Sequence, residues 1–249
     1  MFQDAFWLAK KELKHHWSAI ALSLLFTVFV GGSTGMLLAD SAVKMFEDHA
    51  TSYNCFLLDL IFLGLTPAFA TIFMAKPYLT LQTIKEDPYS KRMAFLRSLP
   101  IPVNVLAFSR TIVMFIILLI MSSAFYLSIV FVLIGMSSTF YDFISTGEFL
   151  IFIFIWFGYA LAVGGINPFI EYGTNGKVLH LFPFIFFGLF LIFILNFYNY
   201  TGQGVVEMIL YYTKNAGWPL AILSLVMGGF GCYIWNKLLT IRLKKRDYV

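Results

Sequence analysis

Six long apolar stretches limit this chain to one kind of fold. Each is close to the ~20 residues that a helix needs to cross ~30 Å of hydrocarbon. Hydrophobic residues make up 60% of the chain and charged residues 12%, so there is too little polar surface to cover a soluble globule. We therefore expect an all-α polytopic membrane protein, a single transmembrane domain over residues 1–249, with spans at 17–39, 56–75, 111–135, 149–170, 178–198 and 218–240.

The basic residues lie almost entirely on one side of these stretches. Six crossings put both termini on the same side, and of the 17 Lys and Arg residues only Lys44 and Lys214 fall on the other. By the positive-inside rule, the basic side faces the cytoplasm. We expect a multi-pass protein of the cell membrane with both termini cytoplasmic, and no nucleic acid among its partners, because topology and anionic membrane lipid explain the positive charge.

Residues 1–16 have the pattern of an amphipathic helix. Apolar side chains recur at helical spacing at Phe2, Phe6, Ala9, Leu13 and Trp17, and basic ones lie on other faces at Lys10, Lys11 and Lys14. We expect this helix to lie on the cytoplasmic membrane surface, either as a plain anchor or as a contact for a partner protein. The first span that follows is too long for a cleaved signal peptide, so we expect it to be retained.

The stretch from Lys76 to Arg110 is the only sizeable cytoplasmic loop. Pro100 and Pro102 exclude a regular helix there, because each lacks an amide donor and pushes the preceding residue towards an extended conformation. We expect one helix to end near Ser98, a rigid elbow, and a new helix beginning near Val103. The elbow is amphipathic, with apolar Met93, Leu96, Leu99 and Ile101 beside basic Lys91, Arg92 and Arg97. This pattern fits either a loop that lies on the membrane surface or an element that docks on a partner protein.

At this loop the sequence resembles the small six-span permease subunits of bacterial ATP-binding-cassette exporters. Many members carry an acidic residue after the second span, then a basic stretch, then a Leu-Pro motif and a helix that starts with a basic residue. Here Glu86 or Asp87 stands at the acidic position, Arg97-Ser98-Leu99-Pro100-Ile101 at the motif, and Arg110 at the basic position. The chain departs from the common pattern at Pro88 and at Pro102-Val103-Asn104.

The resemblance implies partners and site residues. It implies a dimer of permease subunits, identical or closely related, with cytoplasmic ATPase subunits that bind the ATP and Mg, so that this chain holds no cofactor. The implied ATPase-coupling residues are Glu86, Asp87, Leu96, Arg97, Ser98, Leu99, Pro100, Ile101 and Pro102. The first helix resembles the connecting helix of the family, to which we assign Phe6, Lys10, Lys11, Leu13 and Lys14.

A third extramembrane segment lies between the fifth and sixth spans. The apolar run from Val205 to Tyr212 is too short to cross the bilayer, and Gly202, Gly204 and Gly217 flank it. A short half-buried helix in the outer leaflet fits this pattern, and the family resemblance implies re-entrant helices at this position. An interfacial loop rich in tyrosine would have the same sequence.

The sequence lacks the buried charges of ion-coupled transporters and the motifs of nucleotide-binding proteins and intramembrane proteases. The central thirds of the spans carry no charge, because Asp59 is near the outer edge of the second span and Glu148 and Glu171 begin and end the fourth. Coupling to protons or sodium is therefore disfavoured. The sequence contains no GxxxxGK[ST] run, no HExxH run and no serine-protease motif, so we expect no catalytic or metal site. The glycines at 31–32 and 228–229 are expected to allow close helix packing.

These observations predict the transmembrane permease subunit of an ATP-driven exporter. An apolar, Phe-rich interior without buried charge suits a hydrophobic or amphipathic cargo, such as a membrane-active peptide, drug or lipid, moved out of the cell by alternating access. ATP hydrolysis is expected on the partner chain, and this chain is not expected to be an enzyme. The alternatives are a channel-like or regulatory membrane protein, or an intramembrane enzyme with an unrecognised site.

Overall fold

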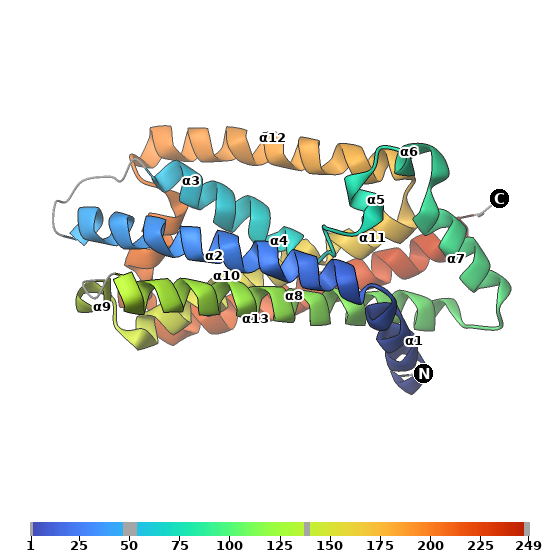
Figure 1. Cartoon of the computed structure of the whole chain (residues 1–249). Helices are drawn as coiled ribbons and strands as arrows, with labels where there is room; N and C mark the ends of the chain where they lie inside the picture. Colours follow the sequence, from blue (N-terminus) through green and yellow to red (C-terminus); the bar gives the residue numbers. More distant parts are fainter. Residues whose placement is uncertain (1, 47–53, 137–139, 247–249) are drawn as a thin grey trace.

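The computed structural model describes residues 2–46, 54–136 and 140–246, which are all-helical, with no strand among them. Five helical segments are long and apolar enough to cross a membrane: α2 (Trp17–Phe46), α8 (Val103–Met136), α10 (Thr146–Gly164) continued by α11 (Ile166–Gly173), α12 (Gly176–Thr201), and the larger part of α13 (Val205–Lys245). They run side by side, and α1 (Phe2–His15) begins at the same end of the bundle at which α13 ends (Figure 1). We call this the terminal end and the opposite one the far end. The expectation of an all-helical fold with several apolar helices of membrane-spanning length is confirmed.

The second expected span, 56–75, is not one long helix. A π-helix, η1 (Leu60–Leu65), joins α3 (Cys55–Asp59) to α4 (Thr66–Ala68), and this run is too short to span ~30 Å by itself. Pro67 lies in the first turn of α4 and has no amide to donate to the Leu63 carbonyl, four residues earlier. Tyr159 of α10 donates to that carbonyl instead, at 2.8 Å. The described chain thus contains five full-length apolar helices rather than six.

Aromatic side chains fill the centre of the bundle. Phe62 of η1 packs against Phe125 of α8 and Trp156 of α10, with ring centroids 5.8 and 5.0 Å apart, and Phe69 lies 5.2 Å from Phe125. All four side chains are fully buried. Large buried rings contribute much of the packing energy of a core, so the short η1 run is held firmly despite its irregular backbone.

Small residues allow the long helices to approach closely. A Cβ added at Gly228 of α13 would lie 2.5 Å from the carbonyl oxygen of Gly158 in α10, and one at Gly231 would lie 3.0 Å from Ala162. Between α2 and α8, a Cβ at Gly31 would lie 2.7 Å from the Phe125 carbonyl oxygen. The expectation that glycines in the first and last spans serve helix packing is confirmed at these three positions.

Three short helices connect α4 to α8 at the terminal end: α5 (Lys76–Leu79), α6 (Thr83–Glu86) and α7 (Pro88–Ser98). Asp87 joins the last two in a left-handed conformation, with φ of 41°, and its carboxylate accepts from the Ser90 amide at 3.3 Å. Beyond α7, an extended residue, Leu99, leads through the two prolines into α8, which begins at Val103. At the far end, α9 (Phe140–Phe143) connects α8 to α10.

The last helix is divided by a break at Gly217, whose φ of 56° is readily accessible only to glycine. The short first part, residues 205–216, packs into the core with Val206 and Leu210 fully buried. Asp59, itself 1% exposed, caps this part by accepting hydrogen bonds from the amides of Val205 and Val206 at 2.8 and 2.7 Å. A carboxylate is well placed there because helix N-termini leave free N–H groups.

We expect Gly228→Ala to destabilise the protein and Gly229→Ala to leave it unchanged or slightly more stable. The first adds a methyl group against the Gly158 carbonyl oxygen, and such overpacking costs about 1–3 kcal/mol. A Cβ at Gly229 meets no atom within 4 Å, and alanine favours a helix over glycine. The midpoint of thermal unfolding in detergent measures both effects. Equal midpoints for the two variants would contradict the close packing of α10 on α13.

Candidate functional site

A buried ion pair connects four helices at the terminal end of the bundle. Glu12 of α1 pairs with Arg110 of α8, and their side chains are 6% and 1% exposed. The same carboxylate lies 3.2 Å from Nη1 of Arg92 in α7 and accepts a hydrogen bond from the Tyr172 hydroxyl of α11 at 2.9 Å. We call Glu12, Arg92, Arg110 and Tyr172 the Glu12 junction.

Small residues bring α1 close enough to α8 for this pairing. Ala5, Ala9 and Glu12 lie on one face of α1 at helical spacing, and all three are buried. Within the junction, the Arg110 guanidinium lies over the Tyr172 ring, 4.4 Å from its centroid, and donates to the Tyr172 hydroxyl at 3.0 Å. Both contacts are of the kind that stabilises a buried guanidinium.

A small polar cavity of about 30 Å³ borders the junction. Its walls include Glu12, Arg110, Tyr172, His16 and Glu171. Nε and Nη2 of Arg110 have no hydrogen-bond partner among the described residues. A cavity of this size holds one or two water molecules, and water there would give these buried N–H groups the partners that they need.

Glu171, in the wall of this cavity, is bonded to Tyr78. The Tyr78 hydroxyl, on α5, donates a short hydrogen bond to the Glu171 carboxylate of α11. Burial, together with the adjacent Glu171 charge, raises the pKa of Tyr78 well above its ordinary value, so Tyr78 stays protonated and remains a donor. Its ring also faces Tyr89 of α7, with centroids 6.3 Å apart, and Tyr89 packs edge-on against Tyr172 at 5.3 Å.

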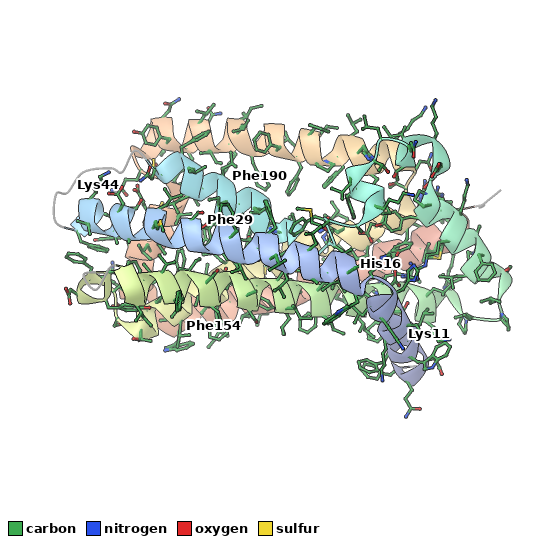
Figure 2. The ribbon with its side chains drawn as sticks, viewed as in Figure 1. Lys11, His16, Phe29, Lys44, Phe154 and Phe190 are labelled. Carbon is green, nitrogen blue, oxygen red and sulfur yellow. The ribbon has the colours of Figure 1, made fainter. Side chains whose placement is uncertain are left out.

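An apolar pocket of about 360 Å³ lies on the other side of Tyr78, between α12 and the η1–α4 run. The aromatic side chains of α12 that line it are Phe182, Phe186, Phe187 and Phe190. Figure 2 labels Phe190. Its polar lining residues are Thr71, Tyr78 and Asn167, and Thr71 also borders the polar cavity. The volume and the apolar lining with a few polar groups are typical of sites for small molecules.

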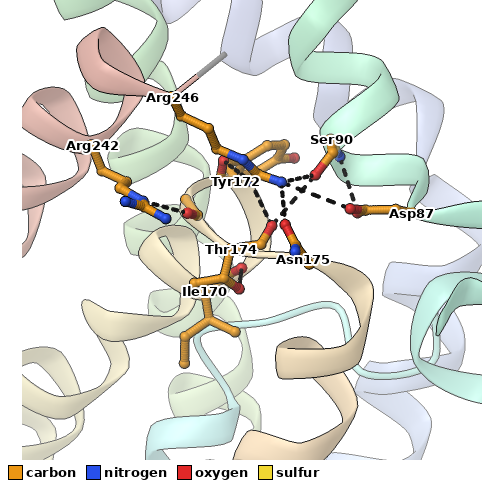
Figure 3. Close-up of polar contacts among 9 residues, drawn as sticks. Asp87, Ser90, Ile170, Tyr172, Thr174, Asn175, Arg242 and Arg246 are labelled. Atoms are coloured by element: carbon orange, nitrogen blue, oxygen red, sulfur yellow. Dashed lines mark hydrogen bonds and ion pairs between the residues drawn. The ribbon is translucent and has the colours of Figure 1, made fainter. Parts of the chain in front are cut away.

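A second polar cluster fastens the end of α13 to α7 and to the turn between α11 and α12 (Figure 3). Arg246 donates to the Thr174 carbonyl oxygen at 2.6 Å and to Ser90 Oγ at 2.7 Å, and lies 3.8 Å from the Asp87 carboxylate. Arg242 donates to the Gly173 carbonyl oxygen at 3.1 Å. The start of α7 is thereby bound to two membrane helices.

The predicted elbow residues divide into buried and exposed ones. Leu96 is 8% exposed and packs with Met93 against α8 and α13. Leu99 is 38% exposed, and the neighbouring Phe95, which the sequence interpretation did not select, is 65% exposed. Arg97 donates to the Arg246 carbonyl oxygen at 2.6 Å. Glu86 is exposed, and Ser98 Oγ donates to the Phe95 carbonyl oxygen at 2.7 Å.

The structure brings the elbow and the first helix together. Pro100, Ile101 and Pro102 share a surface groove of about 710 Å³ with residues of α1 that include Trp7 and Leu8. Of the residues assigned to the connecting helix, Phe6, Lys10, Lys11 and Lys14 are exposed and Leu13 is partly buried. The two segments expected to meet a partner thus form one continuous surface.

The expected apolar face of α1 is not the face that packs on the bundle. Phe2, Phe6 and Trp17 are 65%, 49% and 70% exposed, whereas the inward face carries two alanines and Glu12. The sequence interpretation followed the large apolar residues and therefore missed Glu12. The Ala5–Ala9–Glu12 spacing was the available signal.

The remaining members of the site were missed or placed differently. Arg110 was expected outside the third span, but it lies inside α8 and is 2% exposed. Tyr78, Tyr89 and Tyr172 were not selected, because isolated tyrosines near the ends of spans look like ordinary interfacial residues. Glu171 was expected at the end of the fourth span, and the structure adds its hydrogen bond to Tyr78.

Comparisons of the chain with protein-family models, with curated proteins and with solved structures found no match in any of the three. In residues 2–46, 54–136 and 140–246, no group of three or more His, Cys, Asp or Glu side chains could hold a metal ion. The family resemblance of the elbow therefore stays a prediction, and the function has to be inferred from the geometry of the site.

We expect Arg110→Met to destabilise the protein strongly and Glu12→Leu with Arg110→Met to restore part of the loss. Removing Arg110 leaves the buried Glu12 carboxylate with only Arg92 and the Tyr172 hydroxyl as partners. Breaking a buried pair costs about 3–5 kcal/mol, whereas replacing both partners is often nearly neutral. Thermal unfolding of the single and double variants in detergent gives the coupling between the two residues.

The control is Lys44→Gln, which breaks the partly exposed pair between Lys44 and Asp40 at the far end. Exposed pairs contribute less than about 1 kcal/mol, so its midpoint should stay near that of the parent. Additive losses for Glu12→Leu and Arg110→Met would show that the two residues do not act as a pair.

Proposed function

We propose that this chain is the transmembrane permease subunit of an ATP-driven exporter. The observation that carries the proposal is the Glu12 junction. Through one buried carboxylate, α1 and α7 are bonded to each other and to α8 and α11. A force on α7 is therefore transmitted through Arg92 and Glu12 to Arg110 inside the bundle. An ATPase outside the membrane needs this kind of connection to move helices within it.

The surface made by α1 and the elbow supports a docked partner at this place. The groove lies between Trp7, Leu8 and the 100–102 segment. In the chain just before this segment, Leu99 and Phe95 are also exposed. Exposed Lys10, Lys11 and Lys14 lie on the same helix as Trp7. The occupant in this proposal is a cytoplasmic ATP-binding-cassette ATPase with an apolar ridge and an acidic rim, and ATP and Mg are bound by that subunit. Aromatic anchors in a groove with a charged rim are typical of protein interfaces.

The distribution of charge supports a cytoplasmic terminal end. Lys11 lies at the terminal end and Lys44 at the far end (Figure 2). Lys214, the other exception to the basic side, lies 3.9 Å from the centroid of the Phe46 ring, which also places it at the far end. In this orientation the run from Cys55 to Ala68, extended by residues 69–75, makes a sixth and irregular crossing, and residues 205–216 lie in the outer leaflet.

The apolar pocket supports a hydrophobic or amphipathic cargo. Its aromatic lining has no charged side chain, and α12 on its outer side has few buried residues and is open to lipid. A membrane-active peptide, drug or lipid can enter such a pocket from the bilayer, whereas a sugar or an ion would lose its hydration there. The cargo then leaves the cell between two permease subunits, by alternating access.

The orientation can be tested by cysteine labelling in a background without Cys55 and Cys232. Cysteines introduced beside Lys44 and Asp142 should react with a membrane-impermeant maleimide added to intact cells, and cysteines beside Lys91 and Lys245 should react only after permeabilisation. The reason is the positive-inside rule applied to both ends of the bundle. Strong labelling beside Lys91 in intact cells would reverse the orientation and remove the proposed ATPase contact.

The partner can be tested by copurification of the detergent-solubilised chain from its native cells. We expect an ATP-binding-cassette ATPase to copurify, and Leu99→Asp or Phe95→Asp to reduce its yield at least tenfold, because truncating an anchor at an interface costs ~2 kcal/mol or more. Mass spectrometry and ATPase assay of the eluate measure the result.

Tyr200→Asp is the matched control for this experiment. Tyr200 is 93% exposed like the elbow anchors, but it lies near the end of α12 at the opposite end of the bundle. The amount of permease in the membrane should be the same in all variants. Retention of the ATPase by both Leu99→Asp and Phe95→Asp would show that the elbow is an ordinary surface loop.

A further inference from the structure

We propose that Tyr78 transmits occupancy of the apolar pocket to the Glu12 junction. In this mechanism an apolar molecule in the pocket pushes the Tyr78 ring from the wall, breaks its hydrogen bond to Glu171, and loosens α7. The identity of the occupant as exported cargo rests on the proposed function. The transmission itself depends only on the pocket, the Tyr78–Glu171 bond and the junction.

Tyr78 connects the apolar pocket to a residue of the polar cavity. Its side chain lines the apolar pocket, while the carboxylate that its hydroxyl bonds, Glu171, lines the polar cavity with Arg110 and Glu12. One hydrogen bond therefore links a residue of the apolar pocket to a residue of the cavity that borders the charged groups. Displacement on the first side has a direct consequence on the second.

A freed Glu171 carboxylate would have a new partner available. Arg110 borders the same cavity, and its Nε and Nη2 lack hydrogen-bond partners among the described residues. A buried carboxylate without a donor is unfavourable, so Glu171 turns towards Arg110 when Tyr78 leaves. Arg110 then pairs with two carboxylates, and its ion pair with Glu12 weakens. Because Arg92 of α7 is bonded to the same Glu12 carboxylate, α7 is loosened as well.

The ring of Tyr78 also lies close to α7, so that displacement of this residue occurs beside the helix that it loosens. It faces Tyr89 of α7, which packs against Tyr172 in the junction. The helix that carries Tyr78 has only four residues, Lys76–Leu79, and extended residues bound it at Ala75 and Thr80. Such a segment can shift without unwinding a membrane helix.

The pocket has room for an occupant that can be attached covalently. Gly64 of η1 lines it, and a Cβ added there would meet no atom within 4 Å. A cysteine at this position, with Cys55 and Cys232 replaced by alanine, can be alkylated by N-benzylmaleimide. The benzyl group then stands in for an apolar ligand, and no knowledge of the natural cargo is required.

The experiment measures the loosening of α7 by limited trypsin digestion of the purified full chain. Lys85 and Lys91 are exposed cleavage sites in the segment, and exposed Lys214 near the far end is an internal reference. We expect alkylation of Gly64→Cys to raise cleavage at Lys85 and Lys91 relative to Lys214 about three- to tenfold, the factor that corresponds to loss of one hydrogen bond.

Two variants should abolish this response from opposite sides of the bond. Tyr78→Phe keeps the ring in the pocket wall but removes the hydroxyl, and Glu171→Leu removes the acceptor but keeps the hydroxyl. In both, cleavage at Lys85 and Lys91 should be fast before alkylation and should not rise further. Tyr159→Phe is the matched control, because it also removes a bonded hydroxyl, the one donating to the Leu63 carbonyl oxygen, and it should keep the full response.

Three results would overturn the proposal: no alkylation at position 64, alkylation without a change in relative cleavage, or an undiminished response in Tyr78→Phe and Glu171→Leu. The assay contains no ATPase, so its outcome is independent of the copurification experiment. Failure to find an ATPase would remove the exporter assignment and leave the measured transmission in place. Failure of the transmission would leave the exporter assignment in place.

Discussion

The ion pair between Glu12 and Arg110 organises the terminal end of this protein. Both side chains are almost completely buried, so neither can lose its partner without leaving a charge in a medium of low polarity. Such a pair adds little net stability compared with apolar residues of the same size, but it allows only one arrangement of the elements that supply it. Here it fixes the position of α1 on α8, and Arg92 and Tyr172 extend that arrangement to α7 and α11.

In the bundle as a whole, apolar and polar contacts occupy different regions. Apolar burial, with tilted and edge-on aromatic rings and close glycine contacts, holds the helices together along most of their length, and the hydrophobic effect behind it has no directional preference. Directional contacts are concentrated at the terminal end, where Arg246 binds the start of α7 and Tyr78 binds Glu171. The apolar pocket borders this polar region at Tyr78. A movement in the apolar region is therefore transmitted to the polar region through only a few side chains.

Local chemistry predicted some elements well and others poorly. The boundaries at Ser98 and Val103 follow from the two prolines between them, because a missing amide acts on its own neighbours in any fold. The second span is not a regular helix, and near its proline the same chemistry applies: Pro67 cannot donate to the Leu63 carbonyl, and a tyrosine of another helix donates to it instead. The burial of Glu12 on α1 was not predicted, because a hydrophobic pattern identifies large apolar residues and not the small ones that allow contact.

The sequence by itself determined that the chain is helical, apolar enough for a membrane, and broken at particular prolines, since these properties depend on residues near one another. Only the tertiary structure decided which charges meet. Tyr172 and Glu12 are 160 residues apart, and Arg110 and Tyr172 are 62 apart. Hydropathy and helical spacing carry no information about such pairs, because they describe one helix at a time. The pocket beside Tyr78 exists because α12 stands apart from the η1–α4 run. That separation depends on how the helices pack and could not be read from the sequence.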